Sequence, residues 1–228
     1  VGNAALDANT TADNNVALGY NSATANTTGA TNVSVGSESF ATNTTGSSNT
    51  ALGHAALYSN TTASNNTAVG RDALVANTTG ATNTAVGSGS LDSNTTGSYN
   101  TGVGYDSLTG ITTGQQNTSI GYAAGQGCTG ASSFNVAVGD ETLNTSGEKS
   151  YNTAIGSDAM RATTTGSANV GVGYNSLAAL TTGANNVAMG SGSLDANTTG
   201  GSNTAIGENA LTHNTTASNN TAVGKSAL

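Results

Sequence analysis

The sequence predicts an all-β chain wound into a parallel β-solenoid, or β-roll, of about thirteen coils of 17 residues each. Three observations predict this fold: a glycine that recurs at a fixed interval, short apolar segments in which polarity alternates, and turn residues between those segments. We expect residues 1–228 to form a single repetitive shaft segment, with an irregular coil near 121–151. The chain opens with VGNAAL and closes with VGKSAL, at the same phase of the repeat, so we expect it to be part of a longer protein.

The repeat is marked by a glycine that ends an AVG, AIG or similar triplet. Successive markers are 17 residues apart, except that Gly121 and Gly139 are 18 apart. The consensus of one coil is G-x-x-A/S-L-x-x-N-T-T-G-x-x-N-T-A-V. We expect two strands and two turns in each coil, with the second strand at the A-L segment, as in Ala56-Leu57. Such a coil cannot bury its apolar face alone, but stacked coils pair in parallel about 4.8 Å apart. The marker glycines, for which we expect a structural role, are Gly2, Gly19, Gly36, Gly53, Gly70, Gly87, Gly104, Gly121, Gly139, Gly156, Gly173, Gly190, Gly207 and Gly224.

The three residues before each marker glycine predict a short strand. The last of them is aliphatic or Met, as in Val69, the first is Thr or Val, as in Thr67, and a small residue lies between. This alternation is typical of a strand with one buried face, and it predicts that Thr67 and Val69 both point inward. No apolar pattern with helical spacing is present. We expect the core to contain Val35, Leu57, Val69, Leu74, Val86, Leu91, Val103, Leu108, Ile155, Leu177, Ile206 and Leu211.

An asparagine begins the N-T-A-V segment of every coil. Stacked side-chain amides form hydrogen-bonded ladders in cross-β assemblies, and a buried amide at a turn also satisfies backbone groups. We therefore expect a structural column, although a row of ligand-binding amides is the alternative. Its members are Asn15, Asn32, Asn49, Asn66, Asn83, Asn100, Asn117, Asn135, Asn152, Asn169, Asn186, Asn203 and Asn220.

The coil between Gly121 and Gly139 breaks the pattern. Gly125 replaces the usual Leu, and GQGCTGASSF replaces the regular turn. Phe134 and Tyr151 fall at equivalent positions of neighbouring coils, so we expect their rings to stack. One interpretation is a tolerated insertion on a surface turn. The alternatives are a bend, a loop for a partner, or a cross-link between chains through Cys128, the only cysteine.

The composition argues against several classes of function. The net charge is -8 and there is no basic patch, so nucleic acid is not an expected partner. No run of about 18 apolar residues exists, so we expect no membrane contact by this segment. His54 and His213 lie far apart in the repeat, without visible partners for catalysis or metal binding. We expect no catalytic residue, no metal and no cofactor.

The motif N-[TV]-A-[VI]-G followed by x-x-A/S-L, repeated over essentially the whole chain, resembles the head repeats of YadA-like trimeric autotransporter adhesins and the β-solenoid repeats of phage tail fibres. The resemblance implies a left-handed roll in which three chains assemble side by side, although the coils of that family are typically shorter. A burial argument also favours a homotrimer or a homopolymeric filament. Each coil offers only two or three apolar side chains, worth roughly 1.5–3 kcal/mol each, against a backbone ordering cost of about 1–2 kcal/mol per residue.

These features predict a non-catalytic structural segment: the shaft or stalk of an adhesin, tail fibre or surface filament, exposed on a cell or virion. A receptor or glycan would then bind elsewhere on the fibre or through weak contacts along its side. The alternatives are an ice-binding solenoid, since flat Thr arrays order water, and a glycan-binding solenoid. The inward orientation predicted for Thr67 argues against ice binding. A glycan-cleaving enzyme needs paired carboxylates, whereas the acids here are scattered.

Overall fold

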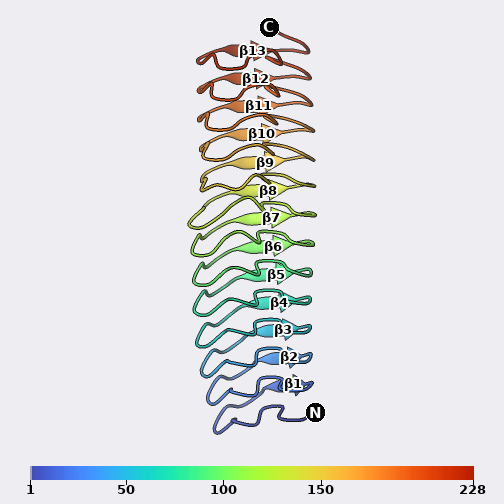
Figure 1. Cartoon of the computed structure of the whole chain (residues 1–228), viewed down its shortest axis with the longest axis vertical. Helices are drawn as coiled ribbons and strands as arrows, with labels where there is room; N and C mark the ends of the chain where they lie inside the picture. Colours follow the sequence, from blue (N-terminus) through green and yellow to red (C-terminus); the bar gives the residue numbers. More distant parts are fainter. Residues whose placement is uncertain (1) are drawn as a thin grey trace. The chain divides into compact units, whose positions relative to one another are not determined.

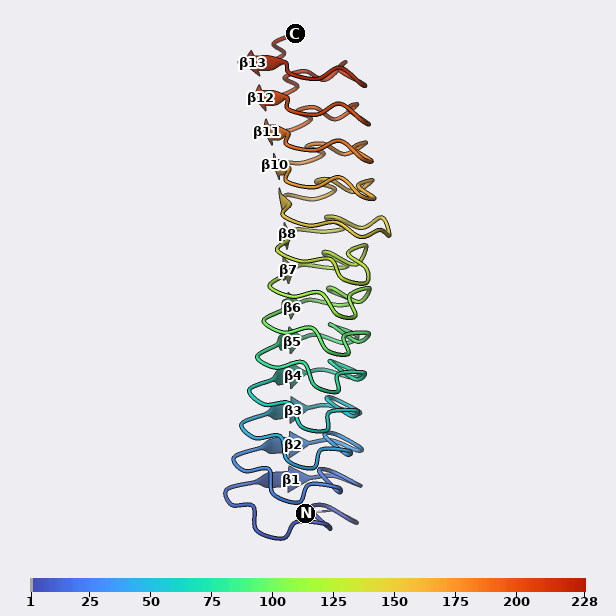
Figure 2. The same cartoon turned by 90° about the vertical axis from the view of Figure 1, so that its left-hand side faces the viewer.

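The computed structural model describes residues 2–228 and has an all-β architecture built of stacked coils. The chain divides into two compact units: unit 1 ends at Gln115, and unit 2 runs from Gln116 to Leu228. Each coil contributes one three-residue strand, and the described residues contain no helix. The expectation of a second strand at the A-L segment is wrong, because this segment is a turn in which Leu57 has a φ of 53°. Figure 1 shows the strands of each unit stacked in the order of the sequence, and Figure 2 shows the same stacking from the side.

The strands of unit 1 are β1 (Val16–Leu18), β2 (Val33–Val35), β3 (Thr50–Leu52), β4 (Thr67–Val69), β5 (Thr84–Val86) and β6 (Thr101–Val103). Those of unit 2 are β7 (Thr118–Ile120), β8 (Val136–Val138), β9 (Thr153–Ile155), β10 (Val170–Val172), β11 (Val187–Met189), β12 (Thr204–Ile206) and β13 (Thr221–Val223). Within each unit every strand pairs in parallel with the next strand along the chain.

The register of this pairing confirms the predicted 17-residue coil. Val69 lies beside Val86, and Val86 lies beside Val103. At the irregular coil the offset rises to 18, where Ser119 pairs with Ala137, so the extra residue is absorbed outside the strands. Equivalent residues of successive coils therefore form columns, as the β-solenoid prediction requires.

The marker glycines occupy a backbone conformation that other residues avoid. Gly53 and Gly70 have φ values of 136° and 137°. A Cβ atom on Gly53 would lie 2.4 Å from the carbonyl oxygen of Gly70 on the next coil. Both the dihedral angle and the close approach of the next coil require glycine, which confirms the structural role predicted for this column.

Each regular coil also turns through non-glycine residues in the left-handed region. Leu57 has a φ of 53°, Asp72 of 58° and Thr82 of 60°, and their equivalents in other coils behave alike. This conformation is uncommon for residues other than glycine, and is worst for bulky or β-branched ones. The left-handed residues destabilise the backbone locally, but they turn the chain sharply enough for 17 residues to close a coil. Glycine occupies such a position at Gly89 and Gly192.

The prediction that Thr67 and Val69 point inward is wrong. Ala68 between them is fully buried, whereas both of its neighbours are only half-buried. The interior beside the middle strand residue has no room for a large side chain. A Cβ atom on Gly102, the equivalent in β6, would lie 2.6 Å from Oγ of Ser90 and 3.3 Å from Cγ of Leu91. The small residue therefore faces the core, and the larger ones face outward.

This reversal divides the predicted core into two groups. The leucine after each marker glycine is buried as predicted, at Leu57, Leu74, Leu91, Leu108, Leu177 and Leu211. The strand residues of the predicted core lie on the outer face instead. They are the half-buried Val35, Val69 and Val103 and the more exposed Val86, Ile155 and Ile206.

Candidate functional site

The predicted asparagine column is buried and links each coil to the next. Nδ2 of Asn66 donates to the carbonyl oxygen of Gly80 at 2.9 Å, and Oδ1 of Asn66 accepts from the backbone N–H of Asn83 at 2.9 Å. Some members also bond directly, as when Nδ2 of Asn186 donates to Oδ1 of Asn169 at 3.1 Å. The side-chain amides of this column are hydrogen-bonded within the protein, which confirms the predicted structural role and contradicts a row of ligand-binding amides.

A second asparagine ladder was not predicted. It uses the Asn of the N-T-T-G turn: Nδ2 of Asn60 donates to Oδ1 of Asn43 at 3.0 Å, and Nδ2 of Asn77 donates to Oδ1 of Asn60 at 3.0 Å. The following threonine hydroxyl adds another bond, since Oγ1 of Thr61 donates to the carbonyl oxygen of Thr78 at 3.2 Å. The recurrence of Asn and Thr in this turn is the sequence signal for the ladder, but turn propensity alone also explains it.

The outer face of the sheet exposes aliphatic side chains in both units. We use "outer sheet face" for the first and third residues of every strand. In unit 1 it carries Thr50, Thr67, Thr84 and Thr101 beside Leu52, Val69, Val86 and Val103. In unit 2 it carries more aliphatic residues, including Ile120, Ile155, Met189 and Ile206, which are 38–43% exposed.

The outer sheet face has no charged side chain in any strand of the described residues. Its aliphatic residues repeat at every coil, about 4.8 Å apart, so each unit presents a continuous apolar ridge beside a Thr and Val column. Monomeric soluble proteins rarely expose large contiguous apolar patches, and such patches mark interaction sites. The arrangement can therefore bury apolar surface against a partner without desolvating any charge on the outer sheet face.

The irregular coil does not form an exposed insertion. Cys128 is fully buried, and Lys149 on the next coil is 1% exposed. Nζ of Lys149 donates to the carbonyl oxygens of Thr145 and Thr163, both at 2.5 Å. Burial raises the pKa of the Cys128 thiol to about 11, against an opposing effect of the Lys149 charge. Burial likewise lowers the pKa of Lys149.

These contacts correct the sequence-based interpretation of this coil. Because Cys128 is inaccessible, it cannot cross-link chains as the folded protein stands. The Lys149 ammonium also fills interior space, so the irregular turn is part of the core. The predicted ring contact is confirmed: Phe134 and Tyr151 stack with centroids 5.0 Å apart and planes 3° from parallel.

The two histidines do not form a reactive centre. His54 is exposed and its Nδ1 lies 3.8 Å from Oδ1 of Asp72, and His213 is also exposed. Within residues 2–228, no three His, Cys, Asp or Glu side chains gather in a way that would hold a metal ion. The same residues include no helix that is long and apolar enough to cross a membrane.

Comparison of this chain with protein-family models, with curated proteins and with solved structures finds no match.

Proposed function

We propose that this chain is a non-catalytic structural segment, the shaft or stalk of an extracellular fibre. The observation that carries the proposal is the continuous bonding between coils: strand pairing and two asparagine ladders connect successive layers in each unit. A segment made of identical layers provides length and stiffness, because each layer depends only on its neighbours. The resemblance to adhesin and tail-fibre repeats supports a place on a cell surface or virion.

We further propose that copies of the chain associate side by side, as a trimer or as a homopolymeric filament, through the outer sheet face. The face is uncharged and rich in aliphatic side chains such as Val86 and Ile206, which are 36% and 40% exposed. Burying this surface would contribute roughly 25 cal/mol per Å². Association would therefore supplement a core in which most coils bury only one or two large side chains, such as Leu57 or Leu108 and Ile111.

The oligomer is tested by measuring mass with analytical ultracentrifugation. The wild-type chain is expected to sediment as a trimer or larger species. Leu52→Asp with Val86→Asp places two charges on the face, two coils apart, and is expected to give a folded monomer. Thr45→Asp with Thr79→Asp has the same spacing on an exposed turn, and is expected to leave the mass unchanged. A wild-type chain that is a folded monomer would refute the association, as would unchanged mass in the first variant.

The outward orientation of Thr67 gives a second candidate function some support. Thr50, Thr67, Thr84 and Thr101 form an uninterrupted outward column in unit 1, with a repeat set by the strand spacing of about 4.8 Å. Regular hydroxyl and methyl groups of this kind can order water into an ice-like layer. A thermal-hysteresis measurement tests this candidate. Hysteresis that is lost in Thr67→Tyr but kept in Thr62→Tyr would favour ice binding over association through the same face.

A further inference from the structure

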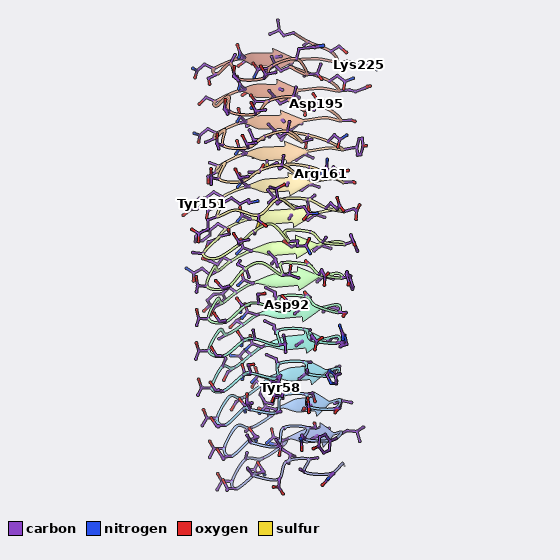
Figure 3. All side chains as sticks on the ribbon, in the orientation of Figure 1. Tyr58, Asp92, Tyr151, Arg161, Asp195 and Lys225 are labelled. Carbon is purple, nitrogen blue, oxygen red and sulfur yellow. The ribbon has the colours of Figure 1, made fainter. Side chains whose placement is uncertain are left out.

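Unit 2 has an open hollow on its surface, and none of the residues that line it belongs to a strand. The hollow has a volume of about 320 Å³ and is lined by Arg161, Asn175, Ala178, Ala179 and Asp195, together with Ala162. Arg161, Ala178 and Asp195 occupy equivalent positions of three successive coils, so the two charged residues are about 10 Å apart. Figure 3 shows Arg161 and Asp195 on the same side of the unit.

The floor of the hollow exists because small residues are stacked there. Backbone bonds hold the three coils together, from the N–H of Ala162 to the carbonyl oxygen of Ala178 and from the N–H of Ala179 to that of Asp195. In unit 1 the position that corresponds to Ala178 carries the larger Val75, and Tyr58 lies where Arg161 does. The alanines therefore leave a depression with an apolar floor, between a guanidinium on one side and a carboxylate on the other.

The polar groups around the floor retain hydrogen-bonding capacity. Nε of Arg161 lies 3.3 Å from Oδ1 of Asp158, and Oδ1 of Asp195 accepts from Oγ1 of Thr212 at 2.7 Å. Among the described residues, the terminal nitrogens of Arg161, Oδ2 of Asp195 and the side-chain amide of Asn175 make no further hydrogen bond or ion pair. The site thus offers donors from Arg161, an acceptor from Asp195 and both from Asn175.

We propose that this hollow binds a neutral sugar residue. A sugar ring presents hydroxyl groups that both donate and accept, which matches the mixed donors and acceptors, and its C–H face fits the alanine floor. Asp158 and Asp195 against Arg161 leave the site with a net charge of about -1, which disfavours a carboxylate or phosphate ligand. A bound cation is also disfavoured, because the Asp158 carboxylate is already paired with the Arg161 guanidinium. Only the carboxylate of Asp195 would then be left to bind the cation.

The binding is weak for one chain, because the hollow is open and its floor lacks an aromatic platform. We expect a dissociation constant of about 1–10 mM for a monosaccharide. Copies of the chain displayed together would raise the avidity for a glycan-coated surface. The hollow lies wholly within one chain, so the inference stands whether or not the proposed association is correct.

The test uses saturation-transfer difference NMR on the whole chain, with methyl glycosides of glucose, galactose, mannose and N-acetylglucosamine as probes. At least one probe is expected to receive saturation from the wild-type protein. Ala178→Leu fills the hollow, and the equivalent positions Tyr58 and Val75 show that a larger residue is accepted there. This variant is expected to abolish the signal, and Asp195→Asn to weaken binding about tenfold.

The matched control is Asp92→Asn, which removes a carboxylate from the equivalent position in unit 1 and is expected to leave the signal unchanged. Circular dichroism and unfolding midpoints establish that each variant is folded. The absence of saturation transfer to any of the four probes at about 10 mM would overturn the proposal. Equal signals from the wild type and Ala178→Leu, or stronger binding of glycylglycine than of every glycoside, would also overturn it.

Discussion

Asn94 and Ile111 occupy equivalent positions of neighbouring coils, and the side-chain oxygen of Asn94 is buried without a hydrogen bond. In the regular ladder this oxygen would accept from the Asn of the next coil, as Oδ1 of Asn77 accepts from Nδ2 of Asn94 at 3.0 Å. Ile111 has no donor, so the ladder stops there. Ile111→Asn is expected to change the free energy of unfolding by only about 1 kcal/mol or less, because the lost apolar burial is offset by pairing of the Asn94 oxygen.

The control for this prediction is Leu108→Asn, which places an amide in a buried column without a ladder. It is expected to cost about 3 kcal/mol or more. Both variants are compared with wild type by urea denaturation. Equal destabilisation by the two substitutions would mean that the turn asparagines do not act as a ladder.

Thr82 is a second site where the repeat carries local strain. Its φ is 60°, and the equivalent residues Asn65, Asn185 and Asn219 have φ values of 61–63°. Because Asn tolerates the left-handed region better than a β-branched residue, Thr82→Asn is expected to stabilise the protein by about 0.5–1 kcal/mol. Thr79→Asn, at an exposed position outside this region, should have little effect on the melting temperature. A destabilised Thr82→Asn would contradict the strain argument.

The direction of the strand side chains gives a third prediction. Ala85 is fully buried and Val86 is 36% exposed, although they are neighbours in β5. Ala85→Val overfills the interior and is expected to lower the free energy of unfolding by about 1–3 kcal/mol. Val86→Thr should stay within about 1 kcal/mol of wild type, since Thr is common on the outer sheet face. The reverse order of effects in thermal melts would show that the strands face the other way.

The buried Cys128 predicts a pH dependence of stability. Its pKa in the folded state, about 11, lies above the ordinary value of 9.0 because burial disfavours the thiolate. The folded state therefore binds the proton more tightly than the unfolded state. The thiol therefore contributes fully to the free energy of unfolding below a pH of about 9. Up to about 2 kcal/mol of this contribution is lost as the pH rises to about 11. Guanidinium denaturation at pH values across this range measures the loss.

Cys128→Ala is the control for the thiol. In this variant Lys149 remains, and burial lowers its pKa in the folded state. Lys149 therefore binds its proton more tightly in the unfolded protein than in the folded protein. For that group alone, stability rises with pH between the lowered pKa and the ordinary value of 10.5. The alkaline loss of stability should therefore disappear or reverse in Cys128→Ala. An unchanged alkaline loss would assign it to groups other than the thiol.

The repeat period was sufficient to predict the solenoid, the register and the burial of the leucine column. A 17-residue spacing that places Leu57 and Leu74 at the same phase leaves little choice but stacked coils. The prediction of the Phe134–Tyr151 stack followed from the same spacing. In each case only the position within the coil mattered, and the position can be read directly from the sequence.

The inward and outward faces of the strand could not be read in the same way. Polarity favours Val69 as the buried residue, but the volume available inside the coil favours Ala68. That volume depends on how the chain turns at residues such as Leu57, which has a left-handed backbone. This conformation cannot be predicted from the sequence, because leucine rarely adopts it. The buried site of Lys149 was missed for a related reason, because its partners are backbone carbonyls brought near by the irregular turn.

The asparagine columns also affect the susceptibility of the protein to deamidation. Deamidation of an asparagine requires its side chain to turn toward the following backbone nitrogen, and Asn is among the residues that limit survival at high temperature. In Asn66 both ends of the amide are engaged by the neighbouring coil. Conversion of that amide to a carboxylate would replace a donor by a negative charge beside the carbonyl oxygen of Gly80. The layers therefore protect these buried amides, and deamidation should begin at asparagines such as Asn65, which is exposed.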